Sequence, residues 1–425
     1  TMGVSQTKTI DIYGNIKSGS NAGEWIANID ATATGAVTGS TVDADAVNLQ
    51  TITLSTAVLT AAVNTGATPD STNVIAGASD VKVGSFRFTA QYSPYTVQEI
   101  KVKVPANAAT SVTTVTLKYK EKDANGNLVA TSASQALALS SGSQTHATAT
   151  FTGLTFYISQ NTDADLDVYV GVPTVASGAS SGSAISAVLD YDEGFKAVDS
   201  SGTSDTSLAS ADLNSAATTG KGTMYPRRSI ATLSSTPITD ALNAGSNQVI
   251  GRVTVAANAA GDISWKKLAF TVNKTAAVTI GATTTVALYN SANTQITGTF
   301  ATTTGAQLAQ TESFTVLATS GTLVFEATTE QQISAGSSVS YELRGTVGGL
   351  AAGSNLSVSV AAPSTSATTV AYATIHTQVG DTGESFVWSD RSSISTVHSE
   401  ATLDWTHDYL VKTLPLTVGN RSVSF

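Results

Sequence analysis

The sequence contains no cysteine, so disulfide bonds cannot stabilise this 425-residue chain. Core packing, backbone hydrogen bonds or bound ions must stabilise it instead. Methionine occurs only twice, which leaves few side chains open to oxidation. Both scarcities suit a long-lived extracellular protein. We therefore expect a chain of the cell surface, whose signal segment is not part of this sequence and has been removed.

Charged residues are also scarce, at 12% of the chain, about half their usual share. The formal net charge is −10, and no cluster of basic residues could bind phosphates. No run of about eighteen apolar residues occurs, so we expect no membrane-spanning segment. These absences argue against a nucleic-acid partner and a transmembrane protein.

In place of charged residues, the sequence is rich in threonine, serine, alanine, valine and glycine. Apolar residues make up 41%, enough to build a buried core. Threonine and valine are branched at Cβ, which favours strands over helices. No segment shows a sustained helical period, and the composition predicts an all-β fold.

An internal repeat divides most of the chain into two copies. Four segments recur in the same order at a nearly constant offset. The matching pairs are 83–90 with 250–257, 100–104 with 268–272, 113–117 with 284–288, and 181–186 with 352–357.

Each copy reads as short strands with alternating apolar residues, separated by turns. The expected strands are 86–90, 99–104, 115–120, 148–158 and 167–172 in the first copy, and 251–256, 267–272, 285–289, 322–327 and 338–345 in the second. Strands with one apolar face form half-buried antiparallel sheets that must close on each other. The sequence therefore predicts tandem antiparallel β-sandwich (Ig-like) domains.

This pattern divides the chain into three parts. Residues 1–68 form a small N-terminal β module, in which 51–55 is a strand leading into the first repeat. Residues 69–228 form the first sandwich, with a Ser/Thr-rich excursion near 200–222, and residues 229–425 form the second, with an aromatic C-terminal tail. Residues 229–234 are expected to be a strand that joins the two.

The C-terminal tail carries recognisable sequence motifs. They are Ser-Phe-Val-Trp-Ser-Asp at 385–390, His398-Ser399, Asp404-Trp405-Thr406 and the segment 409–416, with a further segment at 191–198. These resemble segments of large secreted surface proteins of ultrasmall bacteria of the candidate phyla radiation (Patescibacteria). The resemblance implies a layer-like role at the cell surface, and it supplies no catalytic residues to transfer.

Acidic residues gather in two places. Asp163 and Asp165 alternate along a predicted strand, and Asp190, Asp192, Glu193 and Asp199 crowd one loop. Converging carboxylates suit Ca²⁺, so calcium is a candidate ligand at these positions. The alternative is that the side chains accept hydrogen bonds from nearby backbone, as expected for the turn 123–127.

No motif for catalysis or for a transition metal occurs in the sequence context that it requires. His376, His398 and His407 lie among carboxylates in the tail, but their spacing matches no zinc pattern. The Gly-x-Ser-x-Gly pattern occurs once, at 178–182, but no helical period follows it as a nucleophile elbow requires, and no pair of catalytic glutamates is evident. The sequence predicts a protein that is not an enzyme.

Aromatic residues in the tail allow two interpretations. Trp388, Trp405 and Tyr409 could form an exposed platform that stacks against sugars, as in an adhesin. Large aromatic side chains are more often buried, and we favour plugs at the end of a sandwich.

Two terminal segments predict self-association. The alternating segments around Lys8, Ile10 and Ile12 and around Leu410, Lys412 and Leu414 read as strands with little protection against edge pairing. Such strands can add to the sheet of a neighbouring copy, head to tail. The alternative is pairing within their own domains.

Taken together, the sequence predicts a structural subunit of a bacterial surface layer or extracellular filament. Its expected partners are copies of itself and a cell-envelope glycan. An adhesin or carbohydrate-binding module, and a phage tail or fibre protein, are the alternatives.

Overall fold

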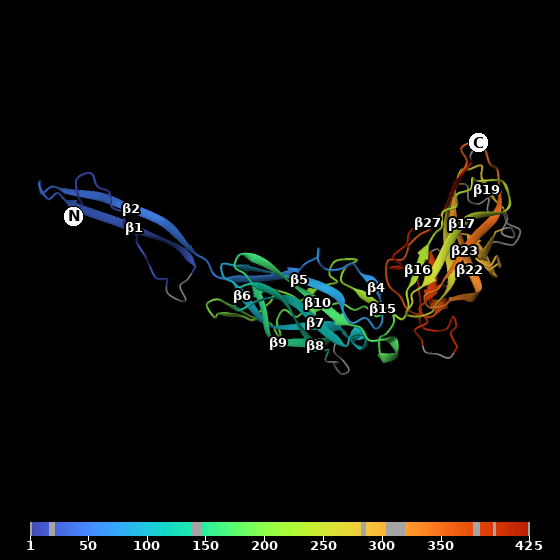
Figure 1. Ribbon diagram of the computed structural model, residues 1–425, viewed down its shortest axis with the longest axis horizontal. Helices are drawn as coiled ribbons and strands as arrows, with labels where there is room; N and C mark the ends of the chain where they lie inside the picture. Colours follow the sequence, from blue (N-terminus) through green and yellow to red (C-terminus); the bar gives the residue numbers. More distant parts are fainter. Residues whose placement is uncertain are drawn as a thin grey trace.

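The computed structural model describes residues 2–16, 22–137, 146–281, 286–302, 319–376, 383–393 and 397–423. The chain forms an elongated molecule with three parts in a row: an N-terminal arm, a middle domain and a C-terminal domain (Figure 1). The strands dominate both domains, which confirms the predicted tandem β-sandwich fold. No helix among the described residues has the length and hydropathy needed to cross a membrane.

The N-terminal arm contains a hairpin of two long antiparallel strands, β1 (Gly23–Thr34) and β2 (Thr41–Leu54). The structure places the next strand, β3 (Val58–Val63), with the middle domain, because it pairs with β5 (Val81–Gln91) along its whole length. The middle sheet thus begins before residue 69, where the sequence placed the boundary.

The middle domain is a sandwich whose two sheets meet at one corner, where Glu121 pairs with Phe156. One sheet has the order β3, β5, β10 (Thr162–Gly171), β7 (Thr114–Lys122), β8 (Leu128–Ala136). The other contains β9 (His146–Ile158), β6 (Tyr95–Pro105), β12 (Lys196–Asp199) and β13 (Ser204–Asp205), with β11 (Val188–Leu189) and β14 (Leu213–Asn214) beside them.

The core of the middle domain forms because inward and outward residues alternate. Phe86 and Phe88 of β5 are buried, whereas Arg87 between them is exposed. Phe88 meets Phe156 of β9 edge-to-face, with ring centroids 5.1 Å apart. Rings from both sheets therefore close the sandwich.

The C-terminal domain repeats this arrangement. Its first sheet holds β16 (Ala231–Ser234), β17 (Gly245–Ala257) and β23 (Ser338–Gly348), with β19 (Thr279–Ile280) and β20 (Ala287–Asn290) paired to β23. Its second sheet holds β21 (Gly298–Thr302), β22 (Ser320–Ile333), β18 (Ile263–Lys274), β24 (Asn355–Val360) and β27 (Leu416–Ser422), with β25 (Phe386–Ser389) and β26 (Trp405–Thr406) at one side.

The pairing of strands confirms the internal repeat. The β3–β5–β10–β7 order of the middle domain corresponds to β16–β17–β23–β20, and β9–β6–β11 corresponds to β22–β18–β24. Thr284 and Thr285, which belong to one of the matched segments, lie outside the described residues.

The two domains meet through a buried, hydrogen-bonded junction. The parallel pair β4 (Thr72–Ile75) and β15 (Met224–Arg227) ends there. The Arg227 side chain is 2% exposed and donates hydrogen bonds to Thr369 Oγ1 (2.8 Å) and Thr406 Oγ1 (3.0 Å) of the C-terminal domain. Asp390, also buried, accepts from Ser181 Oγ at 2.7 Å and from the Arg228 backbone at 2.9 Å. Since unpaired buried charges are unfavourable, these contacts hold the two domains together.

Candidate functional site

The N-terminal arm is the part of the chain whose apolar residues lack a core. In β1, the residues at odd positions from Trp25 to Ala33 are apolar, and those at even positions are mostly polar. The register places Ile52, Val47 and Val42 of β2 on the same face as these odd positions. The hairpin therefore has one apolar face and one polar face.

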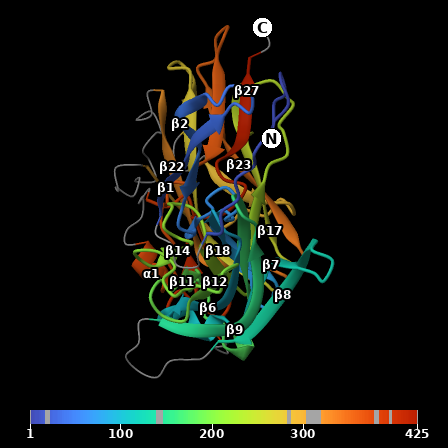
Figure 2. The same ribbon diagram turned by 90° about the vertical axis from the view of Figure 1, so that its left-hand side faces the viewer.

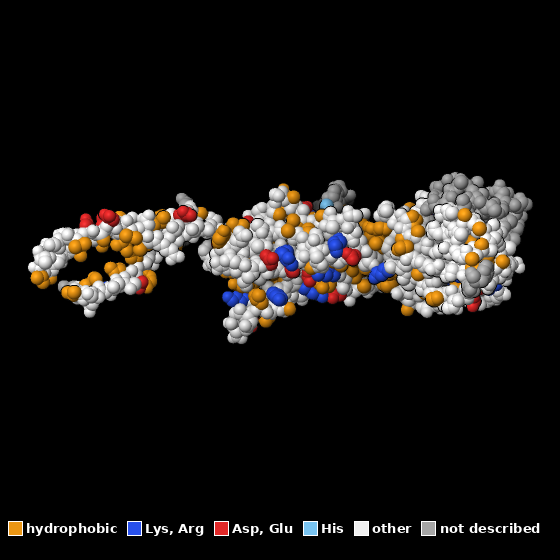
Figure 3. All heavy atoms as spheres, turned by 90° about the horizontal axis from the view of Figure 1, so that it is seen from above, with side chains coloured by type: hydrophobic (Ala, Val, Ile, Leu, Met, Phe, Trp, Pro, Cys, Tyr) orange, Lys and Arg blue, Asp and Glu red, His pale blue; other side chains and the backbone are white. Residues whose placement is uncertain are grey.

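This apolar face is open to solvent. Trp25 is 59% exposed, Ile52 57%, Val47 60% and Val42 66%. Among the described residues, β1 and β2 pair only with each other. Figure 3 shows the hydrophobic side chains of the arm along an open gap and its acidic side chains on the outer side. A two-stranded ribbon by itself is marginally stable in water, so this face is suited to binding another surface.

The segment before the hairpin was expected to be a strand around Lys8, Ile10 and Ile12. That prediction is wrong, because residues 6–16 contain no strand. A strand needs a neighbour to complete its ladder, and none of the described strands pairs with this segment. Ile10 is 76% and Ile12 52% exposed, so these side chains add to the apolar surface of the arm.

The prediction of a second terminal strand, around Leu410, Lys412 and Leu414, is also wrong. Leu410 has a positive φ of 62°, and the next residues form turns, so the strand β27 begins only at Leu416. Leu414 packs against the core of the C-terminal domain, and Lys412 is exposed. This segment therefore forms turns that pack against the C-terminal domain.

The acidic loop before β12 is compensated by lysines of β6. The Asp190 carboxylate is buried and lies 3.1 Å from Lys101 Nζ and 3.0 Å from Lys103 Nζ. Burial alone would raise the pKa of Asp190, but hydrogen bonds from Lys103 and Lys101 outweigh it and lower the pKa to about 2. Lys101 also contacts Glu193 at 2.5 Å, and Lys103 contacts Asp212 at 3.0 Å.

The calcium prediction for this loop stays a prediction. Asp190, Asp192 and Asp212 have carboxylate oxygens within 4.8 Å of one another, as a calcium site would need. Glu193 is not part of this group. Asp199 instead accepts hydrogen bonds from the backbone of Ser201 and Thr203, each at 2.9 Å, and so organises its own turn.

Asp163 and Asp165 lie on the outer face of β10, as their alternation predicted. Asp165 contacts Arg87 Nε at 3.0 Å, and Asp163 accepts from Thr89 Oγ1 at 2.6 Å. Both partners belong to the neighbouring strand β5, so the two carboxylates form part of a cross-strand ladder.

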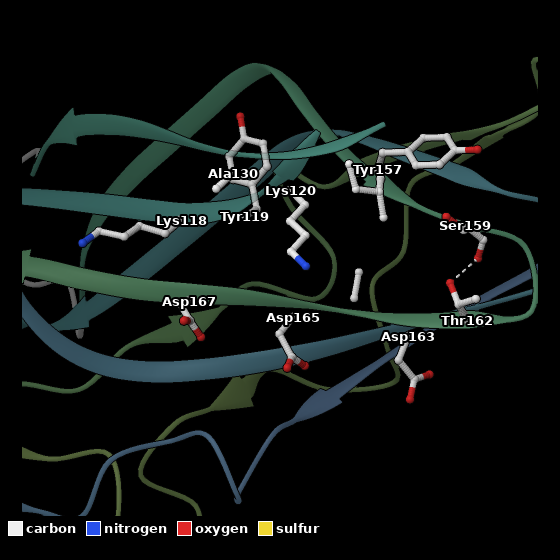
Figure 4. A pocket seen from close by; sticks show the side chains of 12 residues that line it. Lys118, Tyr119, Lys120, Ala130, Tyr157, Ser159, Thr162, Asp163, Asp165 and Asp167 are labelled. Atoms are coloured by element: carbon white, nitrogen blue, oxygen red, sulfur yellow. Dashed lines mark hydrogen bonds between the residues drawn. The ribbon is translucent and has the colours of Figure 1, made fainter. Parts of the chain in front are cut away.

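The outer face of the same sheet carries a row of lysines on β7 that the sequence interpretation missed. Their alternation in Thr-Leu-Lys-Tyr-Lys-Glu-Lys was the signal that could have revealed them. A pocket of about 400 Å³ beside β8 is lined by Lys118, Lys120, Leu128, Ala130, Tyr157, Asp163, Asp165 and others (Figure 4). Lys118 pairs with Asp80 at 2.7 Å, whereas no ion pair among the described residues involves Lys120 or Lys122.

The tryptophans of the tail are buried, which is the interpretation that the sequence favoured. Trp388 and Trp405 are fully buried, and their indole N–H groups donate to the backbone oxygens of His407 (3.1 Å) and Ser399 (2.9 Å). Tyr409 is half-buried and meets Tyr225 edge-to-face at the domain junction. The two indole rings are thus unavailable for stacking against a sugar.

One buried cluster has the connectivity of a catalytic triad. His398 lies 2.9 Å from Ser389 Oγ and 2.6 Å from Glu330, but a second carboxylate, Asp404, lies 3.0 Å from the nitrogen that faces the serine. Burial would lower the pKa of His398, but hydrogen bonds to both carboxylates outweigh it and raise the pKa to about 9. A protonated imidazole cannot act as a general base, and Ser389 is buried. This cluster therefore fits a structural role.

No protein-family model and no curated protein matches the sequence. Among solved structures, the chain is similar to the C-terminal domain of the Streptococcus pyogenes antigen I/II-family protein AspA. The identity is 9% and the TM-score 0.20, over 71% of this chain and 94% of that one. The C-terminal domain of the Streptococcus agalactiae AgI/II polypeptide BspA is similar at 10% identity and a TM-score of 0.16, over 71% of this chain and 95% of that one. Similarities of this size carry no argument about what this chain binds.

Proposed function

We propose that the chain is a structural subunit of a bacterial cell-surface assembly, and that copies of it associate through the N-terminal arm. The exposed apolar face of the β1–β2 hairpin is the observation that carries the proposal. Burying such a face on a neighbouring copy would remove several large apolar side chains from water. The absence of cysteine, the low charge and the tail motifs support an exposed, extracellular setting.

Replacing one apolar side chain of the arm tests the proposal in the full-length protein. We expect Ile52→Asp to weaken self-association by roughly 10- to 100-fold, because burying an isoleucine contributes about 1.5–3 kcal/mol. Ile52 belongs to the apolar face of the arm, so the thermal unfolding of the two domains should not change. Sedimentation velocity over a range of concentrations measures the association.

Ile26→Asp is the matched control. Ile26 is 49% exposed and lies in the same hairpin, but at an even position, on the polar face. Its variant should associate at least as strongly as the wild type, because this face already carries acidic side chains. A wild-type chain that stays monomeric at every concentration would refute arm-driven assembly. Two variants that weaken association equally would refute the role of the apolar face.

A further inference from the structure

The arm and the sheet of the middle domain together define where a second copy would bind. β3, which directly follows the arm, is one edge of the sheet, and β8 is the opposite edge. Four strand spacings separate them, about 19 Å. Figures 1 and 2 show β8 well apart from β1 and β2, so the arm does not reach β8 of its own chain.

β8 is an edge strand without the usual protection. Along its nine residues it pairs only with β7 among the described strands. Its sequence, Leu-Val-Ala-Thr-Ser-Ala-Ser-Gln-Ala, has no charged residue and no proline. Natural edge strands use such residues to prevent pairing with other chains. This edge can therefore accept an additional strand.

The charges of the two partners are complementary. From residue 23 to residue 54 the sequence has no lysine or arginine, and its four charged residues, Glu24, Asp30, Asp43 and Asp45, are all acidic. Asp43 lies on the polar face of the hairpin, where it accepts from Thr32 Oγ1 at 2.7 Å. On the acceptor, Lys120 and Lys122 point outward from β7, one strand inside the edge.

The two faces of the hairpin match the two faces of the sheet. If the acidic face lies on the lysine side, the apolar face continues the inner side of the sheet, where Tyr119 of β7 is buried. A strand of the β2 length, 14 residues or roughly 46 Å, more than covers β8. One orientation of the hairpin places its acidic face on the lysine side and its apolar face on the inner side at the same time.

We propose that β2 of one copy adds to the free edge of β8 in a second copy, with Asp43 on the side of Lys120 and Lys122. This inference rests on the proposed self-association and names its acceptor. Since the donor β2 and the acceptor β8 are different strands of the chain, the contact is heterologous. Repeated copies then grow head to tail into a filament when the rotation between them does not close a ring.

Charge reversal tests this pairing in the full-length protein. Lys120→Glu and, separately, Asp43→Lys should each weaken self-association roughly tenfold at low salt, and the chain with both changes should regain it. Lys196→Glu, in the other sheet of the middle domain, is the matched control and should leave association unchanged. Sedimentation velocity gives the affinities, thermal unfolding verifies the fold, and negative-stain imaging should show filaments for the wild type.

The outcomes separate this inference from the proposed function. If Ile52→Asp abolishes association while Lys120→Glu and Asp43→Lys leave it unchanged, the acceptor is not β8, although arm-driven assembly stands. Failure of the double charge reversal to restore association also overturns the pairing. A purified wild-type chain that does not associate with itself overturns both.

Discussion

Several charged side chains in this protein are removed from water, and each has at least one partner distant in sequence. Asp190 is held by two lysines of β6, Arg227 by hydroxyls of the other domain, and His398 by Glu330 and Asp404. Removing one partner of such a group leaves the other buried without compensation. The contacts of Asp190, Arg227 and His398 thus stabilise the fold.

The raised pKa of His398 predicts how stability depends on pH. The folded pKa of about 9 lies above the unfolded value of about 6.5, so the stabilising contribution is complete below pH 6.5 and is lost as pH rises toward 9. His398→Gln should lower the free energy of unfolding by on the order of 2–3 kcal/mol at pH 6. In this variant the free energy of unfolding should also decrease less steeply between pH 6.5 and 9.

Chemical denaturation at a series of pH values measures this dependence. Burial and the charge of Arg227 lower the pKa of His407 to about 4. His407 therefore titrates below this window and does not interfere. His146→Gln, in the middle domain, is the control and should keep the wild-type decline. An unchanged pH profile in His398→Gln would show that His398 is not the titrating group.

The sequence predicted the elements of the two sandwiches far better than their connections. Alternation located strands such as 86–90 and 338–345, because burial of one sheet face imposes a period of two. It missed the full extent of β1 and β2, whose register is interrupted by bulges between Ile26 and Asn28 and between Ile29 and Ala31. The lysines that neutralise Asp190 were also unpredictable, since they come from a strand far away in sequence.

The turn that precedes β11 shows how a connection fixes the domain junction. Gly182 has a φ of 75°, and a Cβ at this position would overlap Thr369 Oγ1 of the C-terminal domain. We expect Gly182→Ala to destabilise the protein by roughly 1–3 kcal/mol and to split its thermal unfolding into two transitions, because the domains lose their contact.

Gly202→Ala separates this contact from backbone strain. Gly202 has a similar φ of 85°, but a Cβ there would meet nothing within 4 Å. Its variant should lose about 1 kcal/mol and keep the wild-type unfolding profile. Calorimetry in which both variants behave alike would show that the junction does not depend on Gly182.

At the scale of the whole molecule, the two sandwiches form one body, from which the arm with the proposed donor strand β2 extends, and the proposed acceptor β8 is an edge strand of the middle domain. The buried junction around Arg227 and Asp390 fixes the domains, whereas the arm extends away from them (Figure 1). A rigid body with two different, complementary edges is suited to adding copies in one direction. The sequence predicted head-to-tail strand addition through the segments around Lys8 and Leu410, whereas the proposed contact uses β2 and β8, whose exposure and edge position depend on the folded sheet.

Amide hydrogen exchange on the full-length chain, at concentrations below and above association, tests the central claim most directly. Assembly should protect β2 (Thr41–Leu54) and β8 (Leu128–Ala136) together, since each gains backbone hydrogen bonds from the other. Assembly that leaves either strand as exchangeable as in the monomer would contradict the account.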